Sequence, residues 1–231
     1  MSEQIEIRLL GQFELLVGGA STRVPRSSQR LLAFLALSPR RSALRERLTR
    51  VFWPDSTRDR AYGALRTTVC RTKAIGATLL VAERDRLVLG RGVVTDLDRP
   101  WAVSPANIEQ LRRLGLPRLL PAWAEDWVDN ARDRRWQCTK RDASESLRSL
   151  ASDGHLDQAA RLSLHLLAED PLSEPLCLLA IELNSRAGNR AIAAQIFDRY
   201  ERSLWEEYGL RPSERLVSAA AAEGSYACVA S

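Results

Sequence analysis

The second half of the chain repeats itself with a period of 34 residues. When the sequence is shifted by 34 residues, similar residues align with one another. The aligned pairs are Gly154 with Gly188, Ala159 with Ala193, Ala160 with Ala194 and Leu162 with Ile196. In both copies one predicted helix precedes the glycine and another follows it. Small alanines let two helices approach closely, so the pattern predicts paired helices. The alternative is chance matching of alanine in an Ala-rich helical region.

This period, with its central glycine, is typical of tetratricopeptide-like helical hairpins. From about residue 108 the chain reads as helix after helix. Helix starts are predicted near Ser104, Pro121, Asp142, Leu156, Ser173 and Asn189, and stops near Gly115, Gly154, Pro171, Gly188 and Gly209. Trp123 and Trp127 are four residues apart, so we expect them to share a helix face and to pack the first helix of this domain onto its neighbours. Residues 218–231 read as a frayed tail.

The first part of the chain has a different pattern. Short apolar or alternating runs predict strands over residues 5–10, 13–17 and 20–24, with Gly18 and Gly19 at a hairpin turn. Three amphipathic helices are predicted next, over about 28–37, from Ser42 as N-cap to Phe52, and over about 59–75. Two apolar runs around the polar tip 83–86 then predict a second hairpin, over residues 79–89. Strands, three helices and a hairpin occur in this order in a winged helix with an N-terminal sheet.

The sequence therefore predicts a mainly α protein of two domains. Residues 1–97 are expected to form a winged helix-turn-helix domain with an N-terminal antiparallel β-sheet. Residues 98–231 are expected to form an all-α tetratricopeptide-like domain. Gly90, Gly92, Pro100 and Pro105 make residues 90–107 read as a connection between the two.

Positive charge is concentrated at one end of the chain. Residues 1–99 carry 18 Arg and Lys against 10 Asp and Glu, a net charge of +8. Residues 100–231 carry 16 against 19, a net charge of −3. This asymmetry is typical of a nucleic-acid-binding module followed by a neutral or acidic partner module.

The third predicted helix carries cations and hydroxyls away from its apolar face of Ala61, Leu65 and Val69. Arginine in the major groove can bind guanine with two hydrogen bonds, and threonine can contact a phosphate or a thymine methyl. Arginines at the hairpin tip can reach an adjacent minor groove or the backbone. The alternative is that these cations only solvate an outer face. The candidate DNA-binding residues are Arg58, Arg60, Arg66, Thr67, Thr68, Arg71 and Lys73 of the helix and Arg84 and Arg86 of the tip.

Other classes of site have little support in the sequence. The four cysteines form no C-x-x-C pair, and neither histidine has a cysteine beside it, so we expect no metal site and no cofactor, and the cysteines read as free buried thiols. No phosphate-binding loop or Ser/His/Asp set is present, so we expect no enzyme. No apolar run is long enough to span a membrane and the N-terminus is not a signal peptide, so a cytoplasmic location is expected.

At these residues the chain resembles the Streptomyces antibiotic regulatory protein (SARP) type of transcriptional regulator over about residues 5–217. That family joins an OmpR-type winged helix to a bacterial transcriptional activator domain. The resemblance rests on IRLLGQFELLV, QRLLAFLAL, LRERLTRVFWPD and ALRTTVCRTKA in the first part, and on LLPAWAEDWVDNARDRR (119–135) and the segment 169–216 in the second. The family's recognition helix reads approximately A-L-R-T-x-V-S-R-L-R. Arg66, Thr67 and Arg71 match this pattern, and Lys73 takes the place of a second Arg.

The resemblance implies a transcriptional activator that binds promoter direct repeats in double-stranded DNA, usually as side-by-side copies. It also implies contact with RNA polymerase near its sigma factor, and a homodimer is possible. A second hypothesis is a tetratricopeptide-like adaptor that modulates another regulator while its winged helix has drifted. Gly63 inside the recognition helix, the early stop at Gly76 and the Arg-Asp-Arg wing motivate it.

Overall fold

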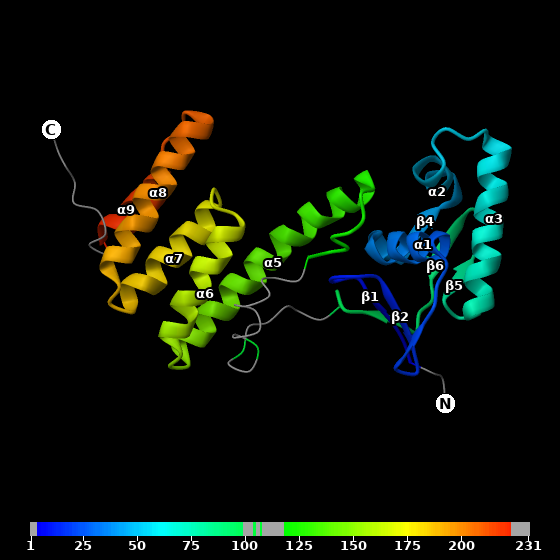
Figure 1. Ribbon diagram of the computed structural model, residues 1–231, viewed down its shortest axis with the longest axis horizontal. Helices are drawn as coiled ribbons and strands as arrows, with labels where there is room; N and C mark the ends of the chain where they lie inside the picture. The colour runs from blue at the N-terminus through cyan, green and yellow to red at the C-terminus, as the bar shows by residue number, and fades with distance from the viewer. Residues whose placement is uncertain (1–3, 99–103, 105–106, 108–117, 223–231) are drawn as a thin grey trace. The chain divides into compact units, whose positions relative to one another are not determined.

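The computed structural model describes residues 4–98, 104, 107 and 118–222, and the fold is reported for these residues (Figure 1). The chain divides into two compact units. The first comprises Met1–Pro100 with Pro117–Arg135, and the second comprises Trp101–Leu116 with Trp136–Ser231. Helices predominate and the strands lie in the N-terminal part, which confirms the predicted fold class.

Two small sheets belong to the first unit, with strand orders β3-β2-β1-β7 and β4-β6-β5. The strands are β1 Ile5–Arg8, β2 Glu14–Val17, β3 Ala20–Thr22, β4 Ser42–Leu44, β5 Leu80–Ala82, β6 Arg86–Leu89 and β7 Val93–Thr95. The predicted N-terminal strands and the second hairpin are present. Sequence reasoning missed β7, which pairs in parallel with β1 inside the segment read as a connection.

Four helical segments complete this unit. They are α1 Arg26–Leu37, the 3-10 turn η1 Pro39–Arg41, α2 Arg45–Phe52 and α3 Arg58–Ile75. The prediction that Ser42 caps the second helix is wrong. Ser42 opens β4, which pairs with β6, and the helix begins three residues later at Arg45.

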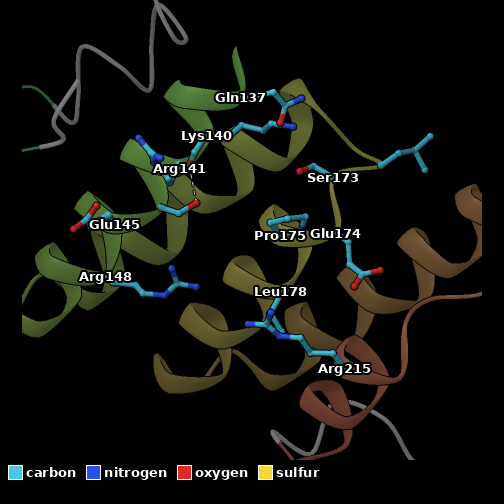
Figure 2. A pocket seen from close by; sticks show the side chains of 12 residues that line it. Gln137, Lys140, Arg141, Glu145, Arg148, Ser173, Glu174, Pro175, Leu178 and Arg215 are labelled. Carbon is cyan, nitrogen blue, oxygen red and sulfur yellow. Dashed lines mark hydrogen bonds between the residues drawn. The ribbon is translucent and has the colours of Figure 1, made fainter. Parts of the chain in front are cut away.

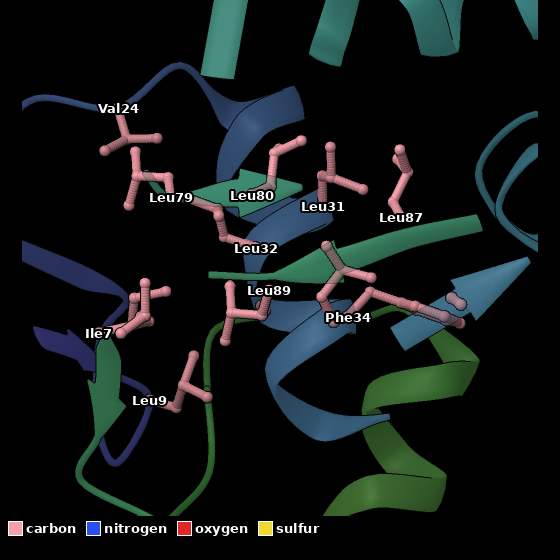
Figure 3. Close-up of a cluster of buried hydrophobic side chains, with 14 of the residues drawn as sticks. Ile7, Leu9, Val24, Leu31, Leu32, Phe34, Leu79, Leu80, Leu87 and Leu89 are labelled. Atoms are coloured by element: carbon pink, nitrogen blue, oxygen red, sulfur yellow. The ribbon is translucent and has the colours of Figure 1, made fainter. Parts of the chain in front are cut away.

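The core of the first unit is mainly aliphatic, and Figure 3 shows the part of it that lies between α1 and the strands. Alternate residues of β1 and the residue after it, Ile5, Ile7 and Leu9, point inward, as the period of two in a half-buried strand requires. Leu31, Leu32, Phe34 and Leu35 of α1 and Leu79, Leu80, Leu87 and Leu89 of the hairpin fill the space between them.

Residues 118–135 pack in the first unit. The Trp127 ring centroid lies 5.1 Å from that of Phe34 and 6.2 Å from that of Phe52. Trp123 stacks on Phe13 at 6.2 Å, and the Arg26 guanidinium lies 3.7 Å from the centroid of the Trp123 ring. Trp123 precedes the helix that contains Trp127, so the expectation that both lie on one helix and pack within the second domain is wrong. The predicted boundary at 97/98 stays a prediction, because the compact units do not follow a single cut of the chain.

Helices make up the described part of the second unit. The bounds are α5 Asp126–Ser152, whose first residues belong to the first unit, α6 Leu156–Glu169, α7 Glu174–Arg186, α8 Arg190–Tyr208 and α9 Glu214–Ala222. The predicted start at Asp142 is wrong, because α5 continues through it. The predicted tail is helical as far as Ala222. Most of the helix predicted from Ser104 to Gly115 lies outside the described residues.

The 34-residue repeat is present in the backbone as well as in the sequence. Gly154 and Gly188 both have positive φ, +92° and +81°, a conformation that glycine adopts without strain. Ala159 and Ala193 are both fully buried, where the following helix packs closely on the preceding one. The turn hydrogen bonds recur at the same spacing, from the His155 amide to the Leu150 carbonyl and from the Asn189 amide to the Asn184 carbonyl.

Candidate nucleic-acid interface

The helix α3 carries most of the candidate residues. Proline cannot continue a helix, so α2 ends before Pro54. The next helix, α3, begins at Arg58. It ends at Ile75, and Gly76 has extended backbone. One face packs on α1 and α2 through Ala61, Leu65, Val69 and Thr72. Figure 1 shows α3 at the border of the first unit, and the residues opposite its packed face are mostly exposed.

The open face of α3 has small side chains along its middle and cations along its flanks. Gly63, Cys70 and Ala74 follow one line at helical spacing, opposite the buried face. Arg66 and Lys73 lie on one flank, and Arg60 and Arg71 lie on the other; all four are exposed. Small residues between two rows of cations allow the helix axis to approach a partner while the long side chains reach around it.

The two adjacent threonines of α3 have opposite environments. Thr67 is exposed, and its hydroxyl donates to the Gly63 carbonyl at 3.1 Å. Thr68 is 4% exposed and donates to the Ala64 carbonyl at 2.9 Å. Thr68 is therefore part of the packed face and is not available to a DNA partner, which corrects its prediction as a contact. Thr72 is fully buried and donates to the Thr68 carbonyl.

Arg58 lies in the first turn of α3, away from the two flanks. It is exposed, and its guanidinium carbon lies 5.8 Å from the Tyr62 ring centroid. A cation over a tyrosine ring is held loosely and keeps its hydrogen-bond donors free. This position suits contact with a phosphate at the helix N-terminus better than contact with a base.

The wing is the hairpin tip 83–86, made of the turn between β5 and β6 and the first residue of β6, and its net charge is zero. Arg84 is exposed, but Glu83 and Asp85 flank it. The Arg86 guanidinium lies 3.9 Å from the Glu83 carboxylate and 3.7 Å from that of Asp85. These exposed pairs are weak, yet each carboxylate also repels a phosphate. Of the two predicted wing residues, Arg84 is the more available.

Arg45 is a residue of this region that sequence reasoning missed. Its backbone amide donates to the Asp85 carbonyl at 2.9 Å, and its guanidinium donates to the Glu83 carbonyl at 3.2 Å. Arg45 thus ties the wing turn to the start of α2. The pairing of β4 with β6 creates this contact, and a three-residue strand gives too little pattern to predict it.

The described residues give no support to a metal site or a membrane-spanning helix. No group of three or more His, Cys, Asp and Glu side chains is placed there to hold a metal ion. Within the described part of the chain, no helix combines the length and apolar character needed to cross a bilayer. The prediction that the cysteines are buried is wrong for Cys70 and Cys138, which are exposed, and is confirmed for Cys177, where burial raises the pKa to about 12; Cys228 lies outside the described residues.

The first unit has a winged helix with an exposed basic helix, and the described part of the second unit is formed by helical hairpins. Residues 117–222 match the family model of the bacterial transcriptional activator domain. This match and the shared fold support the expected resemblance to SARP-type transcriptional regulators.

A solved structure shares the fold over most of the chain. The structure of Mycobacterium tuberculosis EmbR in complex with a low affinity phosphopeptide matches with a TM-score of 0.80 and 16% sequence identity. The match covers 96% of this chain and 65% of the EmbR chain, so this chain spans about two thirds of the length of that protein. No match was found among curated protein sequences.

Proposed function

We propose that this protein is a sequence-specific DNA-binding transcriptional regulator whose α3 helix reads bases in the major groove. The observation that carries the proposal is the open face of α3, with four cations on the flanks of a line of small residues. The bacterial transcriptional activator domain in the same chain supports it. A DNA-binding regulator of this kind acts in the bacterial cytoplasm.

The dimensions of α3 suit a DNA groove. Its 18 residues span about 27 Å at about 1.5 Å per residue. The major groove is about 12 Å wide and admits an α-helix. In this arrangement Arg66 and Arg71 approach base edges, the exposed Thr67 side chain contacts a thymine methyl, and Arg60 and Lys73 reach phosphates. Arg58 and Arg84 contact the backbone on either side of the groove.

The remaining parts of the proposal concern the assembly at a promoter. The protein is proposed to bind direct repeats as side-by-side copies, to contact RNA polymerase near its sigma factor, and to activate transcription. These properties come from the resemblance to SARP-type regulators. From the same resemblance we propose that the protein can form a homodimer.

The direct test is selection of genomic DNA fragments by the purified protein, followed by footprinting of the selected fragments. We expect enrichment of a few promoter regions that contain a repeated half-site, with protection that repeats at the spacing of the half-sites. Uniform recovery of fragments without a footprint would contradict sequence-specific binding.

A second candidate function is a protein–protein adaptor with a winged helix that no longer binds DNA. The zero net charge of the wing favours it, because the wing then adds little attraction for phosphates. The selection experiment separates the two candidates. An adaptor recovers no genomic fragment above background, whereas the regulator recovers specific promoters.

A further inference from the structure

A pocket on the second unit lies outside the candidate DNA interface (Figure 2). It is formed by α5, by the start of α7 and by the start of α9, and has a volume of about 810 Å³. Its residues come from sequence positions 137–215, so one unit builds the whole pocket. Helical hairpins that stack in this way create concave surfaces between their helices.

The pocket has an excess of positive charge. Lys140, Arg141, Arg148 and Arg215 line it, against the carboxylates of Glu145 and Glu174. Three of these cations have carboxylate neighbours: the Lys140 ammonium lies 2.8 Å from Asp170, the Arg148 Nε lies 3.3 Å from Glu182, and the Arg141 guanidinium lies 3.7 Å from Asp142. Figure 2 shows Arg148 and Arg215 extending from α5 and α9 toward the middle of the pocket. Within the described residues, no ion pair involves Arg215.

One hydroxyl in the pocket lacks a hydrogen-bond partner. Ser173 precedes α7 and is only 7% exposed, and in Figure 2 its side chain is turned toward α5. Its Oγ has no partner among the described residues, and it does not cap α7. A buried hydroxyl without a partner costs free energy that an acceptor can restore. The positive end of the α7 dipole lies at the same place.

Apolar side chains border the charged ones. Leu172, Pro175 and Leu178 line the pocket at the start of α7. A small anion would leave this apolar surface unused. None of the twelve described lining residues is aromatic, so the pocket offers no stacking platform for a nucleic-acid base.

We propose that this pocket binds an acidic peptide segment of a protein partner. Carboxylates of the segment pair with Arg141, Arg148 and Arg215, and an apolar side chain of the segment packs on Leu172 and Leu178. The Ser173 hydroxyl donates to a carboxylate or backbone oxygen of the segment. Charge complementarity and the apolar border select this occupant, and the proposal does not depend on DNA binding.

The test uses the full chain and a phage-displayed library of random twelve-residue peptides. We expect the selected peptides to be enriched in Asp and Glu with at least one large apolar residue. A labelled selected peptide should bind an Arg148→Gln/Arg215→Gln variant at least about tenfold more weakly, because two charge-assisted contacts are lost. Ser173→Ala should weaken binding severalfold.

The matched control replaces two exposed arginines of the same unit that do not line the pocket, Arg161→Gln and Arg190→Gln. It has the same net charge as the pocket variant and should bind the peptide like the parent protein. Thermal unfolding checks that each variant is folded. Binding of the DNA fragments recovered in the selection above should not change in the pocket variant, which separates this proposal from the proposed function.

Several results would overturn the proposal. The library could give no peptide, or only peptides without acidic residues. Equal loss of binding in the control variant would mean that net charge alone attracts the peptide. Tight binding of citrate in place of any peptide would identify a small-anion site.

Discussion

At the scale of single residues, the open face of α3 explains why glycine lies inside a helix. A Cβ atom added at Gly63 would meet only the Arg66 guanidinium, at 3.9 Å, so packing does not require glycine there. Glycine in a helix interior costs about 1 kcal/mol relative to alanine. Close approach to a DNA groove is a reason to keep it.

Replacing Gly63 by alanine separates stability from binding. We expect Gly63→Ala to raise the free energy of unfolding by up to about 1 kcal/mol, since helix propensity improves and no clash results. We expect DNA affinity to fall, because the added methyl lies in the middle of the groove-facing line. Denaturant unfolding and gel shifts measure the two effects. A more stable variant with unchanged affinity would show that the middle of this face does not approach DNA.

The adjacent threonines of α3 provide a matched pair. Thr67→Val and Thr68→Val both remove a hydroxyl that donates to the backbone and keep the side-chain volume. We expect Thr67→Val to alter DNA affinity with little change in stability, because Thr67 is exposed. Thr68→Val should change stability and leave the affinity of the folded protein as it was. The reverse result would mean that Thr68, and not Thr67, lies on the DNA-facing side of α3.

The wing is expected to contribute a weak contact that does not depend on sequence. Arg84→Ala should lower affinity for specific and random DNA by a similar factor and reduce the salt slope by no more than about 1. Removing the neighbouring charge, by Asp85→Asn, should strengthen binding to both. Measurement of affinity at several salt concentrations provides the test, and a loss confined to one DNA sequence would indicate base contact by Arg84.

At the scale of elements, the region that matches the activator domain model begins inside the first compact unit, which contains the winged helix. Arg132 of α5 donates to the Leu119 carbonyl at 2.8 Å and to the Trp123 carbonyl at 2.6 Å, which holds the segment before α5 in place. Glu125 accepts from Arg26 at 3.2 Å and pairs with Arg30 at 3.1 Å. These contacts and the tryptophan rings make residues 118–135 part of the first unit's packing.

This packing predicts that Trp127 stabilises the winged helix. We expect Trp127→Ala to lower the free energy of unfolding by about 3 kcal/mol, because its ring contacts with Phe34 and Phe52 are lost and a cavity forms. Trp205→Ala is the control, since Trp205 is 59% exposed and should change stability little. Equal stability of the two variants would mean that the segment does not support the winged helix.

Sequence reasoning reached the long elements and missed the contacts that only tertiary structure creates. The 3.6-residue period located α1 and α3 within about two residues, and the repeat located α6 to α8. The strands β4 and β7 have three residues each and, unlike β3 and β5, do not belong to a predicted hairpin, so they are recognised only from their pairing with β6 and β1. Trp123 and Trp127 gave a helical spacing, but Pro121 and the turn before Asp126 keep Trp123 outside α5.

The candidate site was predictable to a similar degree. Helical spacing separated the exposed cations of α3 from Ala61, Leu65 and Val69, and the burial of those residues agrees. Thr68 was assigned to the open face because threonine is polar, whereas a hydrogen bond to the preceding turn lets the hydroxyl lie in the core. The engagement of Arg86 by the neighbouring carboxylates depends on the geometry of the turn, which the sequence pattern does not specify.

At the scale of the whole molecule, the charge asymmetry and the two compact units fit a division of labour. The basic excess lies in residues 1–99, where the proposed DNA-reading helix is found. The helical unit carries the pocket proposed for an acidic partner segment. If both proposals hold, the protein brings a DNA site and a protein partner together, and mutations in α3 and in the pocket should affect the two activities separately.

The most direct test of the DNA-reading role is the affinity of an Arg66→Ala/Arg71→Ala variant for the fragments that the parent protein selects. We expect a loss of about 1–3 kcal/mol per arginine that contacts a base, and a smaller loss on random DNA. The control is Arg161→Ala/Arg190→Ala, which removes the same charge from exposed positions of the helical unit. Specific affinity equal in the two double variants would contradict base reading by α3.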